Sequence, residues 1–121
     1  MENTERRNRF FDSFFENTKD ESFTKEEIER FKDAASVISG IKSKGEYAEY
    51  DEDQEMFLYV LSLTDKAVLN IMYPKNQEDD PGTYMFSIFN DGEAVFMNML
   101  SLENIVDSTN KMIDDKFLER L

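Results

Sequence analysis

The stretch that decides the fold is residues 55–73, EMFLYVLSLTDKAVLNIMY. It is rich in aromatic, β-branched and other apolar residues, and Thr64 and Asp65 divide it into two runs. Short apolar runs on either side of turn residues are typical of β-strands. We therefore expect two strands, at 55–63 and 67–73, paired as a hairpin around Thr64-Asp65.

A turn centred on Thr64-Asp65 also predicts which side chains share a face, because successive side chains of a strand point to opposite sides of the sheet. One face of this hairpin is expected to carry the following residues of the two strands: Met56, Leu58, Val60, Leu69, Ile71 and Tyr73. The other face of the same hairpin is then also apolar.

A second hairpin is expected at 83–89 and 93–99, where Asp91-Gly92 is a strong signal for a two-residue type I′ turn. That register brings together, across the hairpin, Tyr84, Phe86 and Ile88 with Val95, Met97 and Met99. A weaker strand is expected at 46–50.

Three other segments have the 3.6-residue periodicity of amphipathic helices, at 5–17, 24–39 and about 102–118. Two helices therefore precede the strands and one follows them. The order predicts an α+β fold, with an antiparallel sheet of four to five strands, two N-terminal helices and one C-terminal helix. The length predicts a single acidic domain over 1–121.

Capping signals support the start of two of these helices. Thr24 followed by Glu27 is the pattern of a capping box, in which each side chain satisfies a backbone N–H of the first turn. Ser101 is the expected N-cap of the last helix.

The strands are apolar on both faces, whereas a sheet with one face in water alternates apolar and polar residues. Either the helix at 5–17 covers the second face, or a partner or a second copy of the chain binds there. The residues expected on this alternative binding face are Phe57, Tyr59, Leu61, Met72, Phe89 and Phe96.

The charge pattern limits the partners. The net charge is −13; residues 1–50 carry 9 basic and 12 acidic groups, and residues 51–121 carry 5 basic and 15 acidic groups. A field of this sign repels nucleic acid and anionic membranes and attracts basic partners. We expect a basic protein partner, no direct binding of nucleic acid and no membrane association.

Residue types that carry most enzyme chemistry are missing. The chain has no Cys and no His, and only four Gly, none of them in a phosphate-binding loop. Paired carboxylates are present, but 27 acidic residues in 121 make chance pairs certain. Two acidic runs, beginning at Asp51 and Asn76, carry Met56 and Pro81 where an EF-hand loop has its glycine. We expect no catalytic activity, no cofactor and no metal.

The acidic runs are the candidate partner-binding site. One run precedes and enters the strands, the other lies between the two hairpins, and connections of an antiparallel sheet can meet at one end of it. The residues of the two runs are Glu46, Glu49, Asp51, Glu52, Asp53, Glu55, Glu78, Asp79 and Asp80. A row of carboxylates spaced like phosphates can occupy the basic groove of a nucleic-acid-binding protein, although such loops can also serve only solubility.

In its small size, acidity and lack of Cys and His, the chain resembles two groups of proteins: small phage-type inhibitors that mimic nucleic acid, and bacterial immunity proteins that neutralise basic toxins. The resemblance implies a binding inhibitor or antitoxin-like protein. The alternative is an adaptor or secretion-type chaperone, homodimeric or not, that binds through the apolar sheet face. The lack of Cys and the acidic, polar N-terminus predict a cytoplasmic location.

Overall fold

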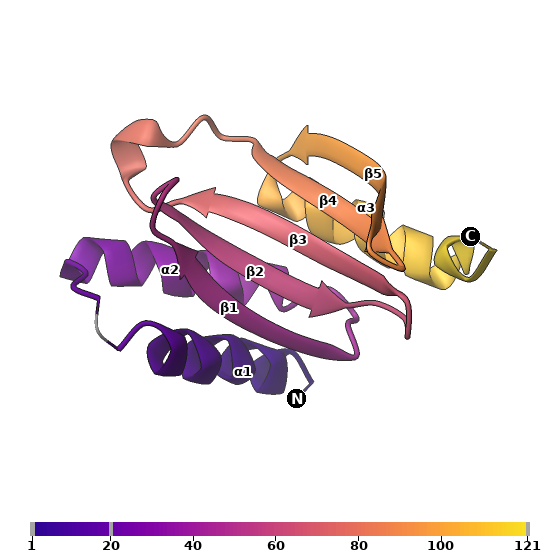
Figure 1. The fold of residues 1–121 in the computed structure, drawn as a ribbon, viewed down its shortest axis with the longest axis horizontal. Helices are drawn as coiled ribbons and strands as arrows, with labels where there is room; N and C mark the ends of the chain where they lie inside the picture. The colour runs from indigo at the N-terminus through magenta and orange to yellow at the C-terminus, as the bar shows by residue number, and fades with distance from the viewer. Residues whose placement is uncertain (1, 20, 121) are drawn as a thin grey trace.

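The structure is a computed structural model that describes residues 2–19 and 21–120 (Figure 1). These residues form three α-helices, α1 (Glu2–Asn17), α2 (Lys25–Ile38) and α3 (Leu102–Asp114). The strands between α2 and α3 are β1 (Gly45–Asp51), β2 (Met56–Ser62), β3 (Ala67–Pro74), β4 (Tyr84–Asn90) and β5 (Glu93–Leu100). Two 3₁₀ helices complete the described chain, η1 (Gln77–Asp79) and η2 (Phe117–Arg120). The predicted α+β fold is confirmed.

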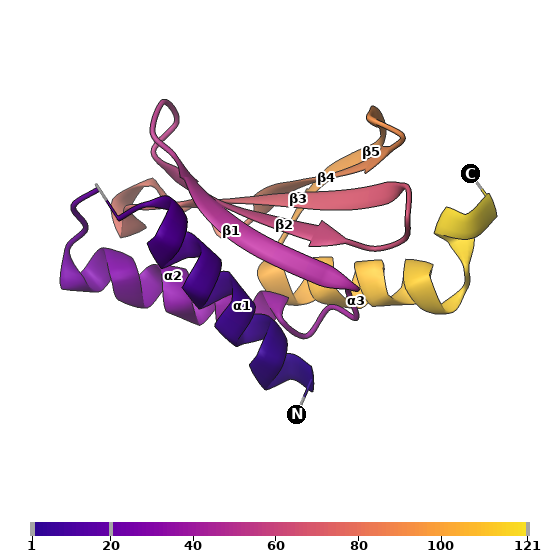
Figure 2. The ribbon, with the colours of Figure 1, turned by 60° about the horizontal axis from the view of Figure 1, so that its bottom comes forward.

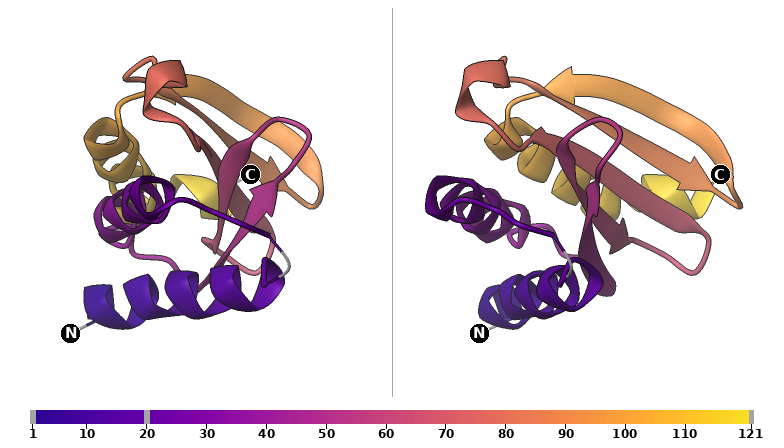
Figure 3. Two further views of the ribbon diagram at one scale, coloured as in Figure 1. Left: turned by 90° about the vertical axis from the view of Figure 1, so that its left-hand side faces the viewer. Right: turned by 60° about the vertical axis from the view of Figure 1, so that its left-hand side comes forward.

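The sheet is an antiparallel meander in which the strands lie side by side in the order β1-β2-β3-β4-β5. Figure 2 shows the three helices below the sheet and none of the described chain packed across its upper side. We call the side toward the helices the inner face and the other side the open face. In Figure 3, α2 and α3 lie against the inner face, while α1 runs along the edge formed by β1.

The core lies between the inner face and the helices. Its centre is aromatic: Phe31 of α2 stacks on Phe14 of α1 at 4.0 Å between ring centroids and on Tyr59 of β2 at 5.4 Å. The Tyr59 hydroxyl is fully buried and donates a hydrogen bond of 2.8 Å to the Phe31 carbonyl, so its burial leaves no polar group unsatisfied. Other fully buried inner-face residues include Phe57, Leu61, Leu69, Ile71, Phe86 and Ile88.

The predicted register of the first hairpin is wrong by one residue. Phe57 pairs with Tyr73, and Ser62 pairs with Val68, so Phe57, Tyr59 and Leu61 share the inner face with Tyr73, Ile71 and Leu69. The cause is the turn, which is one residue longer than expected. The Thr64 hydroxyl accepts hydrogen bonds from the N–H groups of Lys66 and Ala67, at 3.2 and 2.9 Å. A shift of one residue exchanges the two faces of a strand.

The second hairpin begins as predicted and then departs from the prediction. Asp91 and Gly92 both have positive φ, 52° and 84°, as a type I′ turn requires, and Asn90 pairs with Glu93. A β-bulge between Ile88 and Phe89 then shifts the register. The pairs beyond it are Ile88–Phe96, Phe86–Asn98 and Tyr84–Leu100, not the expected pairs with Val95, Met97 and Met99.

The helix signals were largely correct. The capping box at the start of α2 is present, with Thr24 N–H to Glu27 Oε1 at 2.8 Å and Glu27 N–H to Thr24 Oγ1 at 3.1 Å. Ser101 caps α3. The last helix is shorter than expected, because Lys116 has a left-handed φ of 55° that ends the helical path. Phe117, which falls within the expected helix, lies beyond the end of α3 and is exposed.

The helix at 5–17 covers part of the face that carries Phe57 and Tyr59, which was one of the two expected alternatives, because Phe10 packs on Tyr59 and Phe14 on Phe57, each at 5.5 Å between ring centroids. It does not cover the open face. Phe10 and Phe14 of α1 enter the core on the inner face, and α1 protects the edge of the sheet. Its Ser13 hydroxyl accepts the Ala48 N–H of β1 at 2.9 Å, and the Asn17 amide donates to the Ala48 carbonyl at 3.2 Å. These side chains satisfy edge groups that would otherwise be open to another strand.

Within the described residues, none of the helices is both long and apolar enough to cross a membrane.

Candidate functional site

Two acidic loops meet at one end of the sheet. The β1–β2 turn (residues 52–55) and the β3–β4 connection (residues 75–83) are joined by a hydrogen bond of 3.1 Å from the Lys75 N–H to the Glu55 carbonyl. The two loops are adjacent because Met56, which comes directly after the first loop, pairs with Pro74, which comes directly before the second. We call this region the acidic end; it lies at the upper left of the sheet in Figure 1. The sequence allowed the two runs to converge, and the structure brings them together.

Asp80 anchors the β3–β4 connection to α2 and is not exposed toward a partner. Its carboxylate accepts hydrogen bonds from Arg30 Nη2 at 2.9 Å, from the Tyr84 hydroxyl at 2.7 Å and from the Gly82 N–H at 2.8 Å. The Asp80 and Arg30 side chains are only 15% and 13% exposed. Burial alone would raise the pKa of Asp80, but these hydrogen bonds and the Arg30 charge outweigh it and lower the pKa.

The same cluster holds the side chains of Tyr73, Tyr84 and Arg30 in place. Arg30 also donates to the Pro74 carbonyl at 3.0 Å and lies over the Tyr73 ring at 4.7 Å. Burial, followed by the hydrogen bond to Asp80, raises the pKa of Tyr84. Because Asp80 is bonded to both α2 and β4, and Arg30 is also bonded to the end of β3, the loop at the acidic end is held in one arrangement.

Glu46 is the second predicted site residue that is bound internally. Its side chain is 0% exposed. It accepts hydrogen bonds from Arg9 of α1 and from the Ser43 hydroxyl, the latter at 2.7 Å. Glu46 therefore ties α1 to the start of β1, far along the strand from the acidic end.

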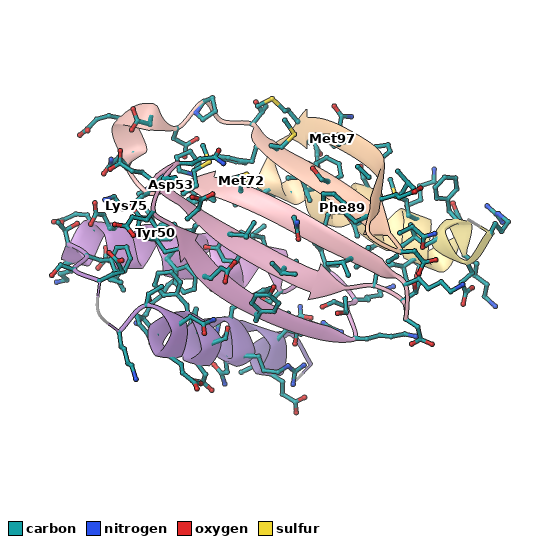
Figure 4. All side chains as sticks on the ribbon, in the orientation of Figure 1. Tyr50, Asp53, Met72, Lys75, Phe89 and Met97 are labelled. Atoms are coloured by element: carbon teal, nitrogen blue, oxygen red, sulfur yellow. The ribbon has the colours of Figure 1, made fainter. Side chains whose placement is uncertain are left out.

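The other seven predicted carboxylates reach solvent. Glu52, Asp53, Glu55, Glu78 and Asp79 are exposed in the two loops, and Glu49 and Asp51 are half-buried on β1. Lys75 is the basic residue among them, at 3.6 Å from both Glu27 and Glu55. Burial alone would lower the pKa of Lys75, but Tyr50 and the two glutamates raise it, so Lys75 remains charged and offsets part of the acidity. Figure 4 labels Asp53, Lys75 and Tyr50 at this end.

The acidic end continues onto α2, which the sequence reasoning missed. A groove of about 500 Å³ lies between α2 and the β3–β4 connection, and its lining includes Glu26, Glu27, Glu29, Asp33 and Glu78. Glu29 and Asp33 belong to α2 and to neither of the two acidic runs. Their closeness to Glu78 depends on how α2 packs against the sheet, and no local sequence signal reports that.

The open face of the sheet is mostly apolar. Its residues follow from the strand pairing, because directly paired residues share a face: Leu58 pairs with Met72, Val68 with Phe89, and Met85 with Met99. Five of the chain's seven methionines belong to it, namely Met56, Met72, Met85, Met97 and Met99. Met97 is 59% exposed and Met99 48% exposed. Figure 4 looks onto this face, where Met72, Phe89 and Met97 are labelled.

The apolar face that is open in the structure therefore contains only some of the residues predicted for the apolar binding face. Met72 and Phe89 lie on the open face as expected. Phe57, Tyr59 and Leu61 are 0% exposed in the core, and Phe96 is half-buried against Phe86 at 5.6 Å between ring centroids. The one-residue error in the first register and the bulge in the second explain these exchanges.

A pocket connects the open face with the acidic end. It has a volume of about 310 Å³, and its walls include Met56, Met72, Met85 and Met99 together with Gln54 and Asp79. Two residues of β1 border the same region, because Asp51 pairs with Met56 and Glu49 pairs with Leu58. Carboxylates and methionines are thus neighbours on one continuous surface.

No cluster of three or more potential ligands that could hold a metal ion occurs in the described part of the chain. Comparison of the chain with protein families, with curated proteins and with solved structures found no match.

Proposed function

We propose that this protein is a small acidic binding protein of the inhibitor or immunity type, which occupies a basic surface of a partner protein. The observation that carries the proposal is the convergence of carboxylates from β1, the β1–β2 turn and the β3–β4 connection at the acidic end. The proposal involves no catalytic step, cofactor or metal.

Electrostatics explains how such an end would work. Carboxylates fixed on two tethered loops concentrate negative potential at one end of the molecule, and this steers a basic surface into contact. The basic surface can be one that otherwise binds nucleic acid, since it presents the same cations to carboxylates as to phosphates. Attraction of this kind weakens with salt, because the screening length falls from about 10 Å at 0.1 M ionic strength to about 3 Å at 1 M.

The test compares two charge-reversed variants with the same net charge. The first changes Glu52, Asp53 and Asp79, which are exposed on both loops of the acidic end, to Lys. The control changes Asp12, Glu16 and Asp107, which are exposed on α1 and α3, to Lys. Each protein is immobilised and used to capture partners from a lysate of the source organism at low and high salt.

The proposal expects capture of a basic protein by the wild type and by the control, and at least a tenfold slower association with the first variant. Equal losses in both variants would mean that only net charge matters. Binding that is indifferent to salt and to both variants would refute the proposal.

The second candidate is an adaptor or secretion-type chaperone, including a homodimeric form, that binds through the open face. The exposure of Met97, Met99 and Val95 favours it, since contiguous exposed apolar patches on soluble proteins mark interaction sites. This candidate expects complexes that resist salt and are lost in a Met97→Gln/Met99→Gln variant. Sedimentation of the wild type at micromolar concentration tests the homodimer.

A further inference from the structure

We infer that the open face binds an amphipathic, basic α-helix of a partner protein, whose apolar side chains lie on the methionines and whose cations reach the acidic end. The inference rests on the proposed function and specifies the partner's chemistry. It treats the acidic end and the open face as two parts of one binding surface.

The apolar part of the surface is suited to adaptable side-chain contacts. Met97 and Met99 are exposed on β5, and Met56, Met72 and Met85 form the wall of the pocket beside them. Methionine is unbranched and polarisable, and surfaces rich in it repack around different apolar partners. A cavity of about 150 Å³ holds a benzene molecule, so the pocket of about 310 Å³ has room for a large apolar side chain of the partner.

The backbone of the sheet favours a helix over an extended segment. On the face of a sheet the N–H and C=O groups are already used between strands, so a segment lying there finds no backbone partners. An extended segment would bury unsatisfied polar groups, whereas a helix satisfies its own. The inner face already binds helices in this way, as Figure 2 shows for α2 and α3.

The charges on the strands select a basic partner. The five strands contain no Lys or Arg, while Glu49 and Asp51 of β1 lie on the open face opposite Leu58 and Met56. A helix that covers this region must supply cations, or it buries carboxylates without compensation. A second copy of the chain supplies none from its own sheet and brings a net charge of −13. Charge complementarity therefore favours a basic helix over a second copy of the chain as the occupant of the open face.

The experiment uses a fluorescent 18-residue peptide of Leu and Lys, with Leu at helical positions i, i+3, i+4 and i+7, titrated with the full chain and followed by anisotropy. Three variants are compared with the wild type: Met97→Gln/Met99→Gln on the open face, the Glu52→Lys/Asp53→Lys/Asp79→Lys variant, and Phe117→Gln. Phe117 is 43% exposed on η2, so its variant is the matched control for loss of an exposed apolar side chain.

The inference expects the Gln pair to weaken peptide binding at least tenfold, mainly through faster dissociation, while Phe117→Gln has no effect. The Lys variant is expected to slow association. A peptide of the same composition with Leu spread around the helix, and one with Glu in place of Lys, are expected not to bind.

Distinct outcomes separate the inference from the proposed function. If the Lys variant loses binding and the Gln pair does not, the acidic end acts alone and the inference is overturned while the proposed function stands. Equal binding of the scrambled peptide overturns the amphipathic helix. Wild-type dimers in sedimentation that the Gln pair converts to monomers overturn it in favour of a second copy.

Discussion

Replacing Asp80 with Ala tests the cluster that holds the acidic end in place. The substitution removes the acceptor for Arg30 Nη2 at 2.9 Å, for the Tyr84 hydroxyl at 2.7 Å and for the Gly82 N–H at 2.8 Å. The first of these bonds joins α2 to the β3–β4 connection, the second joins β4 to it, and the third lies within the connection. The loss should therefore lower the free energy of unfolding and release the loop.

The expected magnitude follows from the geometry. A hydrogen bond to a charged group contributes about 1.5–3 kcal/mol, but bonds in one cluster do not add. Arg30 keeps its bond to the Pro74 carbonyl and its place over the Tyr73 ring, and the pair retains some contact with water. We therefore expect Asp80→Ala to cost about 3 kcal/mol. Asp80→Asn, which keeps acceptor oxygen but loses the charge, should cost about 1–2 kcal/mol.

Urea unfolding followed by circular dichroism measures these losses, with Asp79→Ala as the control. Asp79 is the exposed neighbour of Asp80, and its substitution should change stability by about 0.5 kcal/mol or less. A cost below about 1 kcal/mol for Asp80→Ala, or equal costs for the two Ala variants, would refute the role of the cluster.

The pH dependence has a definite sign. The pKa of Asp80 is lowered in the native state, so its ionised form stabilises the fold above the ordinary value of 3.8. That contribution is lost as the pH falls through the lowered native pKa. The stability difference between wild type and Asp80→Asn should be constant from pH 7 to 5 and shrink at pH 3. A difference that stays constant at pH 3 would contradict this assignment.

Three further experiments test the fold. Thr24→Ala should lower the free energy of unfolding by about 1 kcal/mol, because the Glu27 N–H loses its acceptor; a change of only a few tenths would contradict the capping role. Gly92→Val should cost about 1–3 kcal/mol in the same urea assay, because its φ of 84° is strained for a β-branched residue although no atom obstructs the side chain, whereas Glu93→Gln should have little effect. Phe57→Glu should unfold the protein, while Phe89→Glu should leave the far-ultraviolet spectrum native; the opposite result would restore the register expected from the sequence.

Some elements of this protein are determined by residues close together in the chain. The start of α2 depends on Thr24 and Glu27, three residues apart, and the β4–β5 turn depends on Asp91-Gly92. The order of helices and strands follows from the change of apolar period along the chain. These features were predictable because hydrogen bonds and steric limits within a few residues decide them.

The faces of the strands were decided by details that the pattern of apolar residues does not record. Residues 56–61 are apolar at every position, so alternation cannot say whether Met56 or Phe57 faces the helices. The turn held by the Thr64 hydroxyl bonds fixes that choice, because it moves the register of the first hairpin by one residue. The bulge beside Ile88 moves the register of the second hairpin in the same way, so that Phe96 and not Val95 pairs with Ile88.

The candidate site shows the same division. The sequence by itself determined that the chain is acidic, that its carboxylates gather in two runs, and that its strands are apolar on both sides. Only the tertiary structure decided that Glu46 and Asp80 are bound internally, that α2 adds its carboxylates to the acidic end, and that α1 leaves the open face uncovered. The physical reason is that charge and hydropathy are properties of single residues. Burial and hydrogen bonding instead depend on segments that are 30 to 50 positions apart in the chain and are brought together by packing, as Arg30 and Asp80 are.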